Sequence, residues 1–374
     1  MATVYSPINL GKLELSNRFV RSATWEGMAK EDGSCTPALA DLYLRLAQGG
    51  VGLIISSHAY VSKEGQAGPW QLGLYSDDLL RGLKDMVGKV HQAGGKIAAQ
   101  LAHAGCAAAS NLSGKQPVGP SDRELDDGSW CRGLEKEEIQ ALARSFALAA
   151  MRAKKAGFDA VQIHAAHGYC LSQFLSPYFN QRQDEYGGDI EGRSRIVREV
   201  LQAIKIGAGT EYPVLIKINA QDFLSPGFSM QDMLEVCKML AEEGLEAVEL
   251  SGGTRVSGEY IPSRTHPIKS AEDEVYYFQE AQQFKQAVDL PLILVGGIRS
   301  PEVAENLVTQ DQADLISMSR PLVREPDLIQ RWRSGNREPA ACISDNKCFK
   351  PILNGEGIYC VHTQKGNKNS KSSK

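Results

Sequence analysis

The sequence predicts an α/β protein in which eight parallel strands close into a (β/α)8 barrel, also called a TIM barrel. From Phe19 onward, a short apolar segment, a loop and an amphipathic segment follow one another repeatedly along the chain. This alternation of strand and helix is typical of a parallel sheet. Glycines stand where several of the helices should end, at Gly49, Gly94, Gly157 and Gly244. The first strand lacks the glycine-rich phosphate fingerprint of a doubly wound sheet, so we expect a closed barrel.

The expected strands are short runs rich in Val, Ile, Leu and Ala that follow glycine or polar residues. They are Phe19–Arg21, Gly52–Ser56, Ile97–Leu101, Ala160–Ile163, Val214–Ile218, Ala247–Leu250, Leu292–Val295 and Leu315–Met318. Each is followed by a segment with apolar residues at helical spacing. The expected helices are Pro37–Gln48, Leu79–Ala93, Glu135–Ala156, Gly192–Ile206, Met230–Glu243, Val275–Ala287, Pro301–Leu307 and Glu325–Trp332.

The composition is that of a soluble globular enzyme. The chain has 374 residues, 42% of them hydrophobic and 23% charged, which is enough to build a large core. The net charge of −4 gives no reason to expect nucleic acid or an acidic membrane surface as a partner. Residues 1–15 do not resemble a signal peptide, and no segment reaches transmembrane length. We therefore expect a cytoplasmic homo-oligomer that acts on a small molecule, with its eight cysteines reduced.

In a parallel barrel the carboxyl ends of all strands meet at one mouth, where the active site is built. The residues at these ends are far more polar than the strands themselves. They are Ser22, Ala23, Thr24 and Trp25; Ser57 and His58; Gln100 and His103; His164, His167 and Tyr169; Lys217 and Asn219; Ser251, Gly252 and Gly253; Gly296 and Gly297; Ser319 and Arg320. Three polar segments are expected as loops over this mouth: 111–132, 225–228 and 255–270.

Three functional side chains follow the fourth strand within six residues: His164, His167 and Tyr169. Two imidazoles can donate hydrogen bonds to an oxyanion, and a nearby phenol can supply a proton. The alternative is a pair of hydrogen-bonded histidines and a packed tyrosine without a catalytic role. We favour catalysis because so many polar groups at the end of an apolar strand require a reason.

The last two strand ends predict a phosphate site. Gly296 and Gly297 allow backbone amides to approach an anion, and Pro301 can begin a helix whose N-terminus faces it. Arg320, preceded by Ser319, adds a guanidinium. Lys217 either points into the barrel, as a Schiff-base lysine or a cation beside an anionic ring, or is buried with a partner. With Gln100 as an amide for a heterocycle edge, these groups together indicate a flavin mononucleotide (FMN) site.

Several motifs are also those of a known family. They are Pro7-Ile-Asn-Leu-Gly with Leu15-Ser-Asn-Arg-Phe, Gln100-Leu-Ala-His-Ala-Gly, His164-Ala-Ala-His-Gly-Tyr with Gln173-Phe-Leu-Ser-Pro, Tyr186-Gly-Gly with Arg193-Ser-Arg, and Val295-Gly-Gly-Ile. From about Tyr5 to Arg333 the chain resembles the Old Yellow Enzyme family of FMN-dependent ene-reductases (NADH:flavin oxidoreductases). The resemblance implies non-covalent FMN, reduced by NADH or NADPH, and reduction of the activated C=C bond of α,β-unsaturated carbonyl or nitro compounds.

The resemblance also implies a role for each site residue. The positions of His164 and His167 bind the carbonyl or nitro oxygen of the substrate, and that of Tyr169 protonates the carbon α to it. The expected FMN contacts are Ser22, Ala23, Thr24, His58, Gln100 and Lys217 around the ring, with Gly296, Gly297, Ser319 and Arg320 at the phosphate.

Five positions depart from the family pattern. Trp25 stands where many members have Thr or Cys, Ser57 where a Glu is common, and His58 where a small residue is common. Cys106 and Lys217 each replace a usual Arg. Lys217 keeps the positive charge but loses the planar fork of the guanidinium. Trp25 either narrows the substrate pocket and tunes the flavin, or packs behind the ring; both interpretations remain open.

Beyond a barrel over residues 1–335, we expect a C-terminal extension over 336–365 and a disordered tail over 366–374. Larger relatives that resemble 2,4-dienoyl-CoA reductase carry a four-cysteine [4Fe–4S] motif in this region. Here Cys342, Cys348 and Cys360 are present, with Asp345 where a fourth cysteine would stand. We interpret the extension as a relic of that motif; a cluster with an Asp ligand is the alternative.

Three other functions remain as alternatives. A metal-dependent barrel hydrolase could use four histidines, His58, His103, His164 and His167, but the first strand has no His-x-His pair, and we expect no metal. An aldolase could use Lys217 as a Schiff base. A flavin-binding sensor or partner protein without turnover would keep the cofactor site alone.

Overall fold

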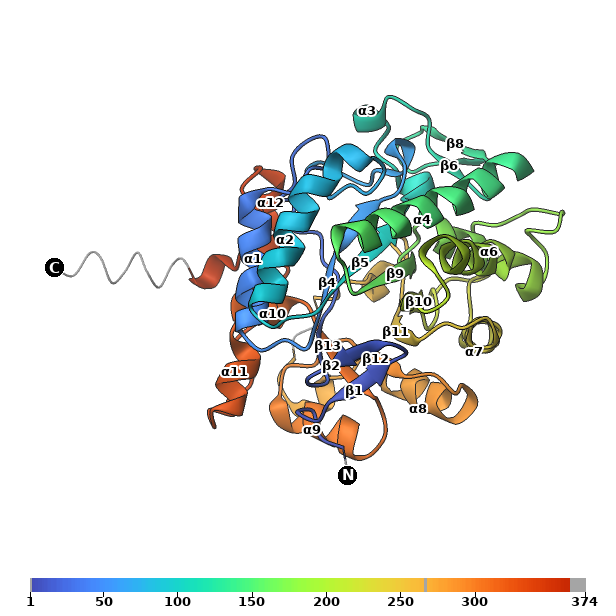
Figure 1. Cartoon of the computed structure of the whole chain (residues 1–374). Helices are drawn as coiled ribbons and strands as arrows, with labels where there is room; N and C mark the ends of the chain where they lie inside the picture. The colour runs from blue at the N-terminus through green and yellow to red at the C-terminus, as the bar shows by residue number, and fades with distance from the viewer. Residues whose placement is uncertain (1, 266–267, 364–374) are drawn as a thin grey trace.

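Eight parallel strands form a closed barrel surrounded by helices (Figure 1). The computed structural model describes residues 2–265 and 268–363. Around the barrel the strands follow the order β3, β4, β5, β9, β10, β11, β12 and β13, and β13 pairs with β3 to close it. The predicted TIM barrel is therefore confirmed. The tail expected to be disordered, residues 366–374, lies outside the described residues.

Each barrel strand coincides with a predicted strand. The strands are β3 (Phe19–Arg21), β4 (Leu53–Tyr60), β5 (Ile97–Ala102), β9 (Ala160–Ala165), β10 (Val214–Asn219), β11 (Ala247–Ser251), β12 (Leu292–Val295) and β13 (Leu315–Met318). Five of them extend farther at the carboxyl end than the apolar pattern indicated. The extensions place polar residues such as His58, His164 and Asn219 within the strands themselves, in fixed positions at the mouth.

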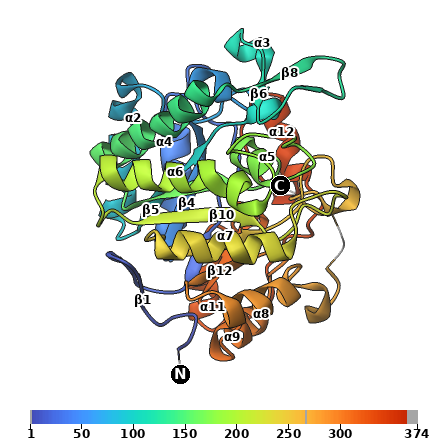
Figure 2. The ribbon, with the colours of Figure 1, turned by 90° about the vertical axis from the view of Figure 1, so that its right-hand side faces the viewer.

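The eight predicted helices are also present. They are α1 (Pro37–Gln48), α2 (Leu80–Gln92), α4 (Lys136–Ala156), α6 (Ile190–Ala208), α7 (Met230–Glu242), α8 (Phe278–Ala287), α9 (Pro301–Thr309) and α11 (Leu328–Arg333). Shorter helices are α3 (Ser110–Ser113), α5 (Cys170–Leu175), α10 (Arg320–Arg324) and α12 (Lys350–Leu353). In Figure 2, α4, α6 and α7 lie side by side over the outside of the barrel.

Local chemistry explains where these helices begin and end. Thr36 accepts a hydrogen bond from the Leu39 amide at the start of α1. Gly157 adopts a left-handed conformation directly after α4, with φ of 96°, as the sequence predicted. Two predicted starts were wrong. Val275 has a φ of 64° and cannot belong to α8. Glu325 precedes a proline, which disfavours the helical conformation, so α10 ends before it and α11 starts later.

A small apolar core closes the bottom of the barrel. The hairpin of β1 (Ile8–Leu10) and β2 (Leu13–Leu15) lies at the amino ends of the strands. Its residues Leu10, Leu13 and Leu15 pack against side chains at the starts of the barrel strands, among them Leu53 and Leu215. The rest of the core lies mainly between barrel and helices. Since this core fills the bottom of the barrel, a ligand would enter the barrel from the mouth.

The segment after β5 corrects two expectations. Residues 111–132 are not a plain loop, because they contribute to α3 and to the short strands β6 (Val118–Gly119), β7 (Arg123–Glu124) and β8 (Trp130–Gly133). β8 returns beside β6 and brings Cys131 to Cys106, next to Gly119. These two cysteines form a disulfide with Cα atoms 5.3 Å apart, so the expectation of eight reduced thiols was wrong. Their separation of 25 residues gave no sign of the pairing.

None of the described helices combines the length and the apolar composition that crossing a bilayer requires.

Candidate active site

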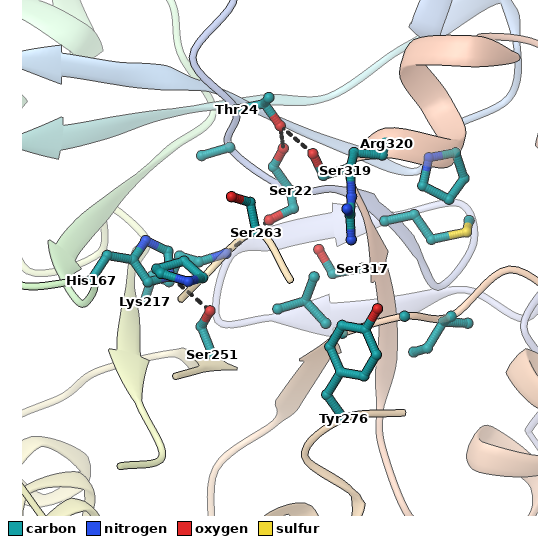
Figure 3. Close-up of a pocket in the computed structure, with 18 of the residues that line it drawn as sticks. Ser22, Thr24, His167, Lys217, Ser251, Ser263, Tyr276, Ser317, Ser319 and Arg320 are labelled. Carbon is teal, nitrogen blue, oxygen red and sulfur yellow. Dashed lines mark hydrogen bonds between the residues drawn. The ribbon is translucent and has the colours of Figure 1, made fainter. Parts of the chain in front are cut away.

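One cavity at the mouth of the barrel brings all fourteen sequence-predicted site residues together. Figure 3 shows part of its lining, including Ser22, His167 and Arg320. The volume of the cavity is about 250 Å³. The predicted residues that line it are Ser22, Ala23, Thr24, Trp25, His58, Gln100, His164, His167, Tyr169, Lys217, Gly296, Gly297, Ser319 and Arg320. They come from the ends of seven strands that are far apart in the sequence. The convergence that a barrel imposes explains why strand ends alone located the site.

The expected mouth loops contribute less than predicted. Of the described residues of segment 255–270, Pro262 and Ser263 line the cavity. Segments 111–132 and 225–228 supply no lining residue. His103, at the end of β5, turns away and borders a separate cavity near Lys115 and α4.

His164, His167 and Tyr169 form one wall, and we call the two imidazoles the histidine pair. The rings of the histidine pair lie 5.1 Å apart between centroids, and the Tyr169 ring lies 4.9 Å from that of His164, edge to face. His167 has a left-handed backbone, with φ of 67°, and its Nε2 is 2.8 Å from Ser251 Oγ. His58 stacks on Tyr169, and its Nε2 lies 3.3 Å from the phenol oxygen.

Burial fixes the protonation states of this wall. It lowers the pKa values of both members of the histidine pair well below the ordinary value, and the positive charge of Lys217 adds to the effect. Burial also lowers the pKa of His58 to about 4. It raises the pKa of the Tyr169 phenol, although Arg255 opposes the shift. At neutral pH the wall therefore presents neutral imidazoles and a protonated phenol, all able to donate a hydrogen bond.

The opposite wall contains the predicted phosphate residues. Gly296 and Gly297 have φ values of 132° and 77°, which an L side chain rarely adopts, and a Cβ on Gly297 would meet the ring of Tyr276. Arg320 extends into the cavity beside Ser319 (Figure 3). Its Nη1 donates to three acceptors on neighbouring loops, the Arg264 carbonyl, the Ser344 carbonyl and Asn346 Oδ1. Its Nε and Nη2 donate to none of the described residues, which leaves them available for an anion.

The amides just before α9 already bind a carboxylate of the protein. The helix begins at Pro301 as expected, but the amides of Arg299 and Ser300 donate to the Glu274 carboxylate at 2.8 and 3.1 Å. The hydroxyl of Ser300 also donates to Glu274. The negative charge at this helix end is therefore supplied by the protein itself.

A buried polar network forms the floor, and the sequence analysis identified only part of it. Lys217 Nζ lies 3.0 Å from Glu249 Oε1 and donates to Ser22 Oγ at 2.8 Å. Glu249 also accepts from Gln162 Nε2 at 2.9 Å, and Gln162 Oε1 accepts from Gln100 Nε2 at 2.8 Å. Of the alternatives for Lys217, the structure combines two: it borders the cavity and is paired. Glu249 was not identified from the sequence, although a charged residue inside an apolar strand could have indicated it.

The segment Ser22–Trp25 is fixed from behind. Arg21 donates to the Ser22 carbonyl and to Thr24 Oγ1, and its Nη2 pairs with Glu26 at 3.4 Å. Arg21 and Glu26 are both fully buried. Thr24 Oγ1 in turn lies 2.6 Å from Ser319 Oγ. This contact joins the segment Ser22–Trp25 to the predicted phosphate residues at the end of β13.

The cavity fits a polar, planar ligand. Three of its lining residues carry a buried polar atom without a hydrogen-bond partner: Trp25 Nε1, His164 Nδ1 and Tyr276 Oη. Buried polar groups normally find partners, so such atoms in a cavity wall are typical of a ligand site. The donors on the floor, the planar walls and the Arg320 guanidinium match the amide edge and the phosphate of FMN.

The C-terminal extension reaches the same cavity. Cys342, Ser344 and Phe349 line it, and none of them was predicted to. Cys342 also borders a second space of about 20 Å³ with Cys348 and Cys360. That space holds about one water molecule, so a [4Fe–4S] cluster does not fit these residues as they lie. Asp345, the suggested fourth ligand, already binds His362 at 2.8 Å.

Two alternative functions lose their residues in this arrangement. Over residues 2–265 and 268–363, no group of three or more His, Cys, Asp or Glu side chains is placed to hold a metal ion. A hydrolase based on four histidines would also need His103, which borders a different cavity. An aldolase would need a free amine at Lys217, whereas Lys217 Nζ is engaged by the Glu249 carboxylate at 3.0 Å.

Several known proteins are similar to this chain over most of its length. Over 375 residues the chain is 33% identical to an NADH oxidase of Thermoanaerobacter brockii, covering 95% of this chain and 57% of the relative. It is also 33% identical over 325 residues to an NADPH dehydrogenase of Bacillus subtilis, covering 86% of this chain and 92% of the relative. An old yellow enzyme homologue from Zymomonas mobilis superposes with a TM-score of 0.79 at 28% identity, over 96% of this chain and 98% of its own.

The relatives differ in length. A metal reductase of Desulforamulus reducens is 33% identical, and the match covers 96% of this chain but 53% of the relative. The chain thus spans little more than half the length of this protein and of the NADH oxidase. The profile of the NADH:flavin oxidoreductase / NADH oxidase family matches residues 3–338, which is most of the chain. The resemblance read from the motifs is confirmed: the chain belongs to this family of flavin-dependent oxidoreductases, with FMN as its cofactor.

Proposed function

We propose that this protein uses NADH or NADPH to reduce the activated C=C bond of α,β-unsaturated carbonyl or nitro compounds. The observation that carries the proposal is the wall of His164, His167 and Tyr169, three neutral hydrogen-bond donors on one side of the mouth cavity. Bound FMN supplies the redox chemistry, taking two electrons from the nicotinamide and passing a hydride to the β carbon of the substrate. The names of relatives, NADH oxidase, NADPH dehydrogenase and morphinone reductase, support an oxidoreductase of this kind.

The histidine pair binds the carbonyl or nitro oxygen of the substrate. Negative charge builds on that oxygen as the β carbon is reduced, and two N–H donors directed at one atom stabilise it. The low pKa values keep both rings neutral, so neither carries a positive charge before the substrate arrives. Ser251 holds the ring of His167 through the 2.8 Å contact with Nε2. This contact fixes the orientation of the His167 ring at the cavity.

Tyr169 supplies the proton that completes the reduction at the α carbon. Its raised pKa keeps the phenol protonated at neutral pH, and its position beside His164 places it next to the bound oxygen. His58 accepts or donates across the 3.3 Å contact to the phenol and orients it. We therefore propose that His58 orients the proton donor Tyr169, and that it does not contact FMN directly.

The remaining predicted residues hold the cofactor. Ser22, Ala23, Thr24, Gln100 and Lys217 are proposed to meet the ring edge, and Gly296, Gly297, Ser319 and Arg320 the phosphate. Trp25 lines the cavity and lies close to Gly68, and its indole is proposed to limit the space left for the substrate.

The test combines spectroscopy and turnover. The purified protein should show the absorption bands of bound flavin, and NADPH or NADH should bleach them in the absence of oxygen. Addition of an enone such as 2-cyclohexenone should then restore the bands with formation of the saturated ketone. Bleaching that no activated alkene reverses would favour a sensor without turnover. A protein that stays colourless after reconstitution with FMN would refute the assignment.

A further inference from the structure

A completely buried carboxylate lies beneath the cavity without lining it. Glu249 is at position 249 of β11, directly opposite Lys217 of β10 in the strand register. Its exposed fraction is 0% and that of Lys217 is 3%, so water screens neither charge. Glu249 Oε1 lies 3.0 Å from Lys217 Nζ and also accepts from the hydroxyls of Ser22 and Ser317 at 2.7 and 2.8 Å.

The pairing of Lys217 with Glu249 reduces the net charge next to the cavity. Lys217 borders the cavity and supplies a positive charge, but the carboxylate 3.0 Å behind it supplies an equal negative one. At low dielectric a charge at this distance strongly offsets its neighbour. Burial acts to raise the pKa of Glu249, but Lys217 and the donated hydrogen bonds together outweigh it and lower the pKa, which favours the ionised carboxylate. A ligand above Lys217 therefore meets a nearly neutral pair.

Glu249 also sets the direction of two amides. A carboxylate can only accept hydrogen bonds, so Gln162 must turn its NH2 group to Glu249 Oε2. The Gln162 oxygen then faces Gln100, which must turn its own NH2 group to it. This leaves the Gln100 carbonyl oxygen as the end of the series, on a residue that lines the cavity. The orientation of the Gln100 amide at the cavity is thus decided by the Glu249 carboxylate, through two successive hydrogen bonds.

We infer that Glu249 is a positioning residue that sets the reduction potential of FMN, by offsetting the charge of Lys217, and that fixes Gln100 as a hydrogen-bond acceptor toward the ring. The inference rests on the proposed function only in that FMN occupies the cavity. Two-electron reduction adds negative charge to the flavin ring, so a lone cation beneath it would favour the reduced form. Glu249 opposes that effect and keeps the potential low, which favours passing electrons on to a substrate.

Two substitutions separate the charge from the acceptor. Glu249→Gln removes the charge but keeps an oxygen that Gln162 can donate to. Glu249→Leu removes both. Glu246→Gln is the matched control, because Glu246 is a partly buried carboxylate that pairs with a lysine, Lys205, near the bottom of the barrel. It should change stability without changing the flavin.

The midpoint potential of the FMN-loaded protein is measured by photoreduction against a reference dye, and FMN affinity by fluorescence titration of the apoprotein. Glu249→Gln should shift the reduction equilibrium at least tenfold toward reduced flavin, or about 30 mV for a two-electron couple, whereas Glu246→Gln should leave it unchanged. Glu249→Leu should also weaken FMN binding about tenfold relative to Glu249→Gln, because Gln100 becomes free to turn.

A potential that stays the same in Glu249→Gln, in protein that still binds FMN, would overturn the charge effect. Equal FMN affinity in the Gln and Leu variants would overturn the amide effect. If the Leu variant fails to fold, Glu249→Gln against Glu246→Gln still decides the charge effect. Failure of the parent protein to bind FMN would instead refute the proposed function, so the two failures are distinguishable.

Discussion

Replacing Arg320 with alanine should weaken FMN binding through the phosphate and leave binding of the ring unaffected. A guanidinium has five N–H groups, and two of them belong to Nη1. Nη1 is taken up by Arg264, Ser344 and Asn346, so three N–H groups remain for an anion at the cavity. A hydrogen bond to a charged group contributes about 1.5–3 kcal/mol. Loss of one such bond should therefore raise the Kd for FMN about ten- to a hundredfold.

Riboflavin provides the decisive comparison, because it has the flavin ring but no phosphate. Apoprotein is titrated with FMN and with riboflavin, and binding is followed by the quenching of flavin fluorescence. Arg320→Ala should weaken FMN and leave riboflavin nearly unchanged. Arg320→Lys should give an intermediate loss, because the charge stays but the fork is lost. The matched control is Arg324→Ala, on the same short helix, whose guanidinium faces Cys360 and not the cavity.

The result that refutes this reasoning is an equal loss of affinity for both flavins. Arg320 also holds the extension through Ser344 and Asn346 and the neighbouring loop through the Arg264 carbonyl. Equal losses would mean that it acts by holding these loops, with no direct contact to the phosphate. No loss for either ligand would place the phosphate elsewhere.

Further predictions concern the site and the disulfide. Alanine at either member of the histidine pair should weaken phenolic ligands and slow alkene reduction with FMN still bound; a variant that titrates with a phenol as the parent does would exclude that ring from the oxygen site. Tyr169→Phe should slow enone reduction about 10²–10⁴-fold and spare flavin reduction in stopped-flow experiments. Because burial raises the pKa of Tyr169, the phenol keeps its proton to a higher pH than a free tyrosine does, and a pH–rate profile of the parent should show alkene reduction lost only above the range in which free tyrosine ionises. Trp25→Thr should raise the flavin midpoint potential and admit bulkier alkenes, and no change in either would assign Trp25 to packing. Cys131→Ala should lower the free energy of unfolding by about 3.5 kcal/mol, measured by urea denaturation, because the disulfide closes a 25-residue loop.

The strand ends of this barrel could be read from the sequence because two regularities act together. Apolar runs mark the strands, and a closed parallel barrel gathers whatever follows them at one mouth. Residues such as His164, Gln100 and Arg320 lie where an apolar run stops, so their neighbours in space followed from the fold alone. The same logic failed for segments 111–132 and 225–228, which follow strands but have their own local structure or turn aside. Polar composition identifies an exposed segment, not the direction in which it folds.

Contacts that depend on strand register could not be read in the same way. Lys217 and Glu249 lie in apolar runs separated by more than thirty residues, and each alone is an anomaly. They become a pair only because β10 and β11 align with Lys217 opposite Glu249, and a shift of one residue would turn one side chain to the opposite face. The cost of burying a lone charge requires a partner for each, and the barrel offers few positions for one. An ionisable residue inside a predicted barrel strand therefore indicates a second one on an adjacent strand, and here that rule connects the cation at the cavity to the carboxylate beneath it.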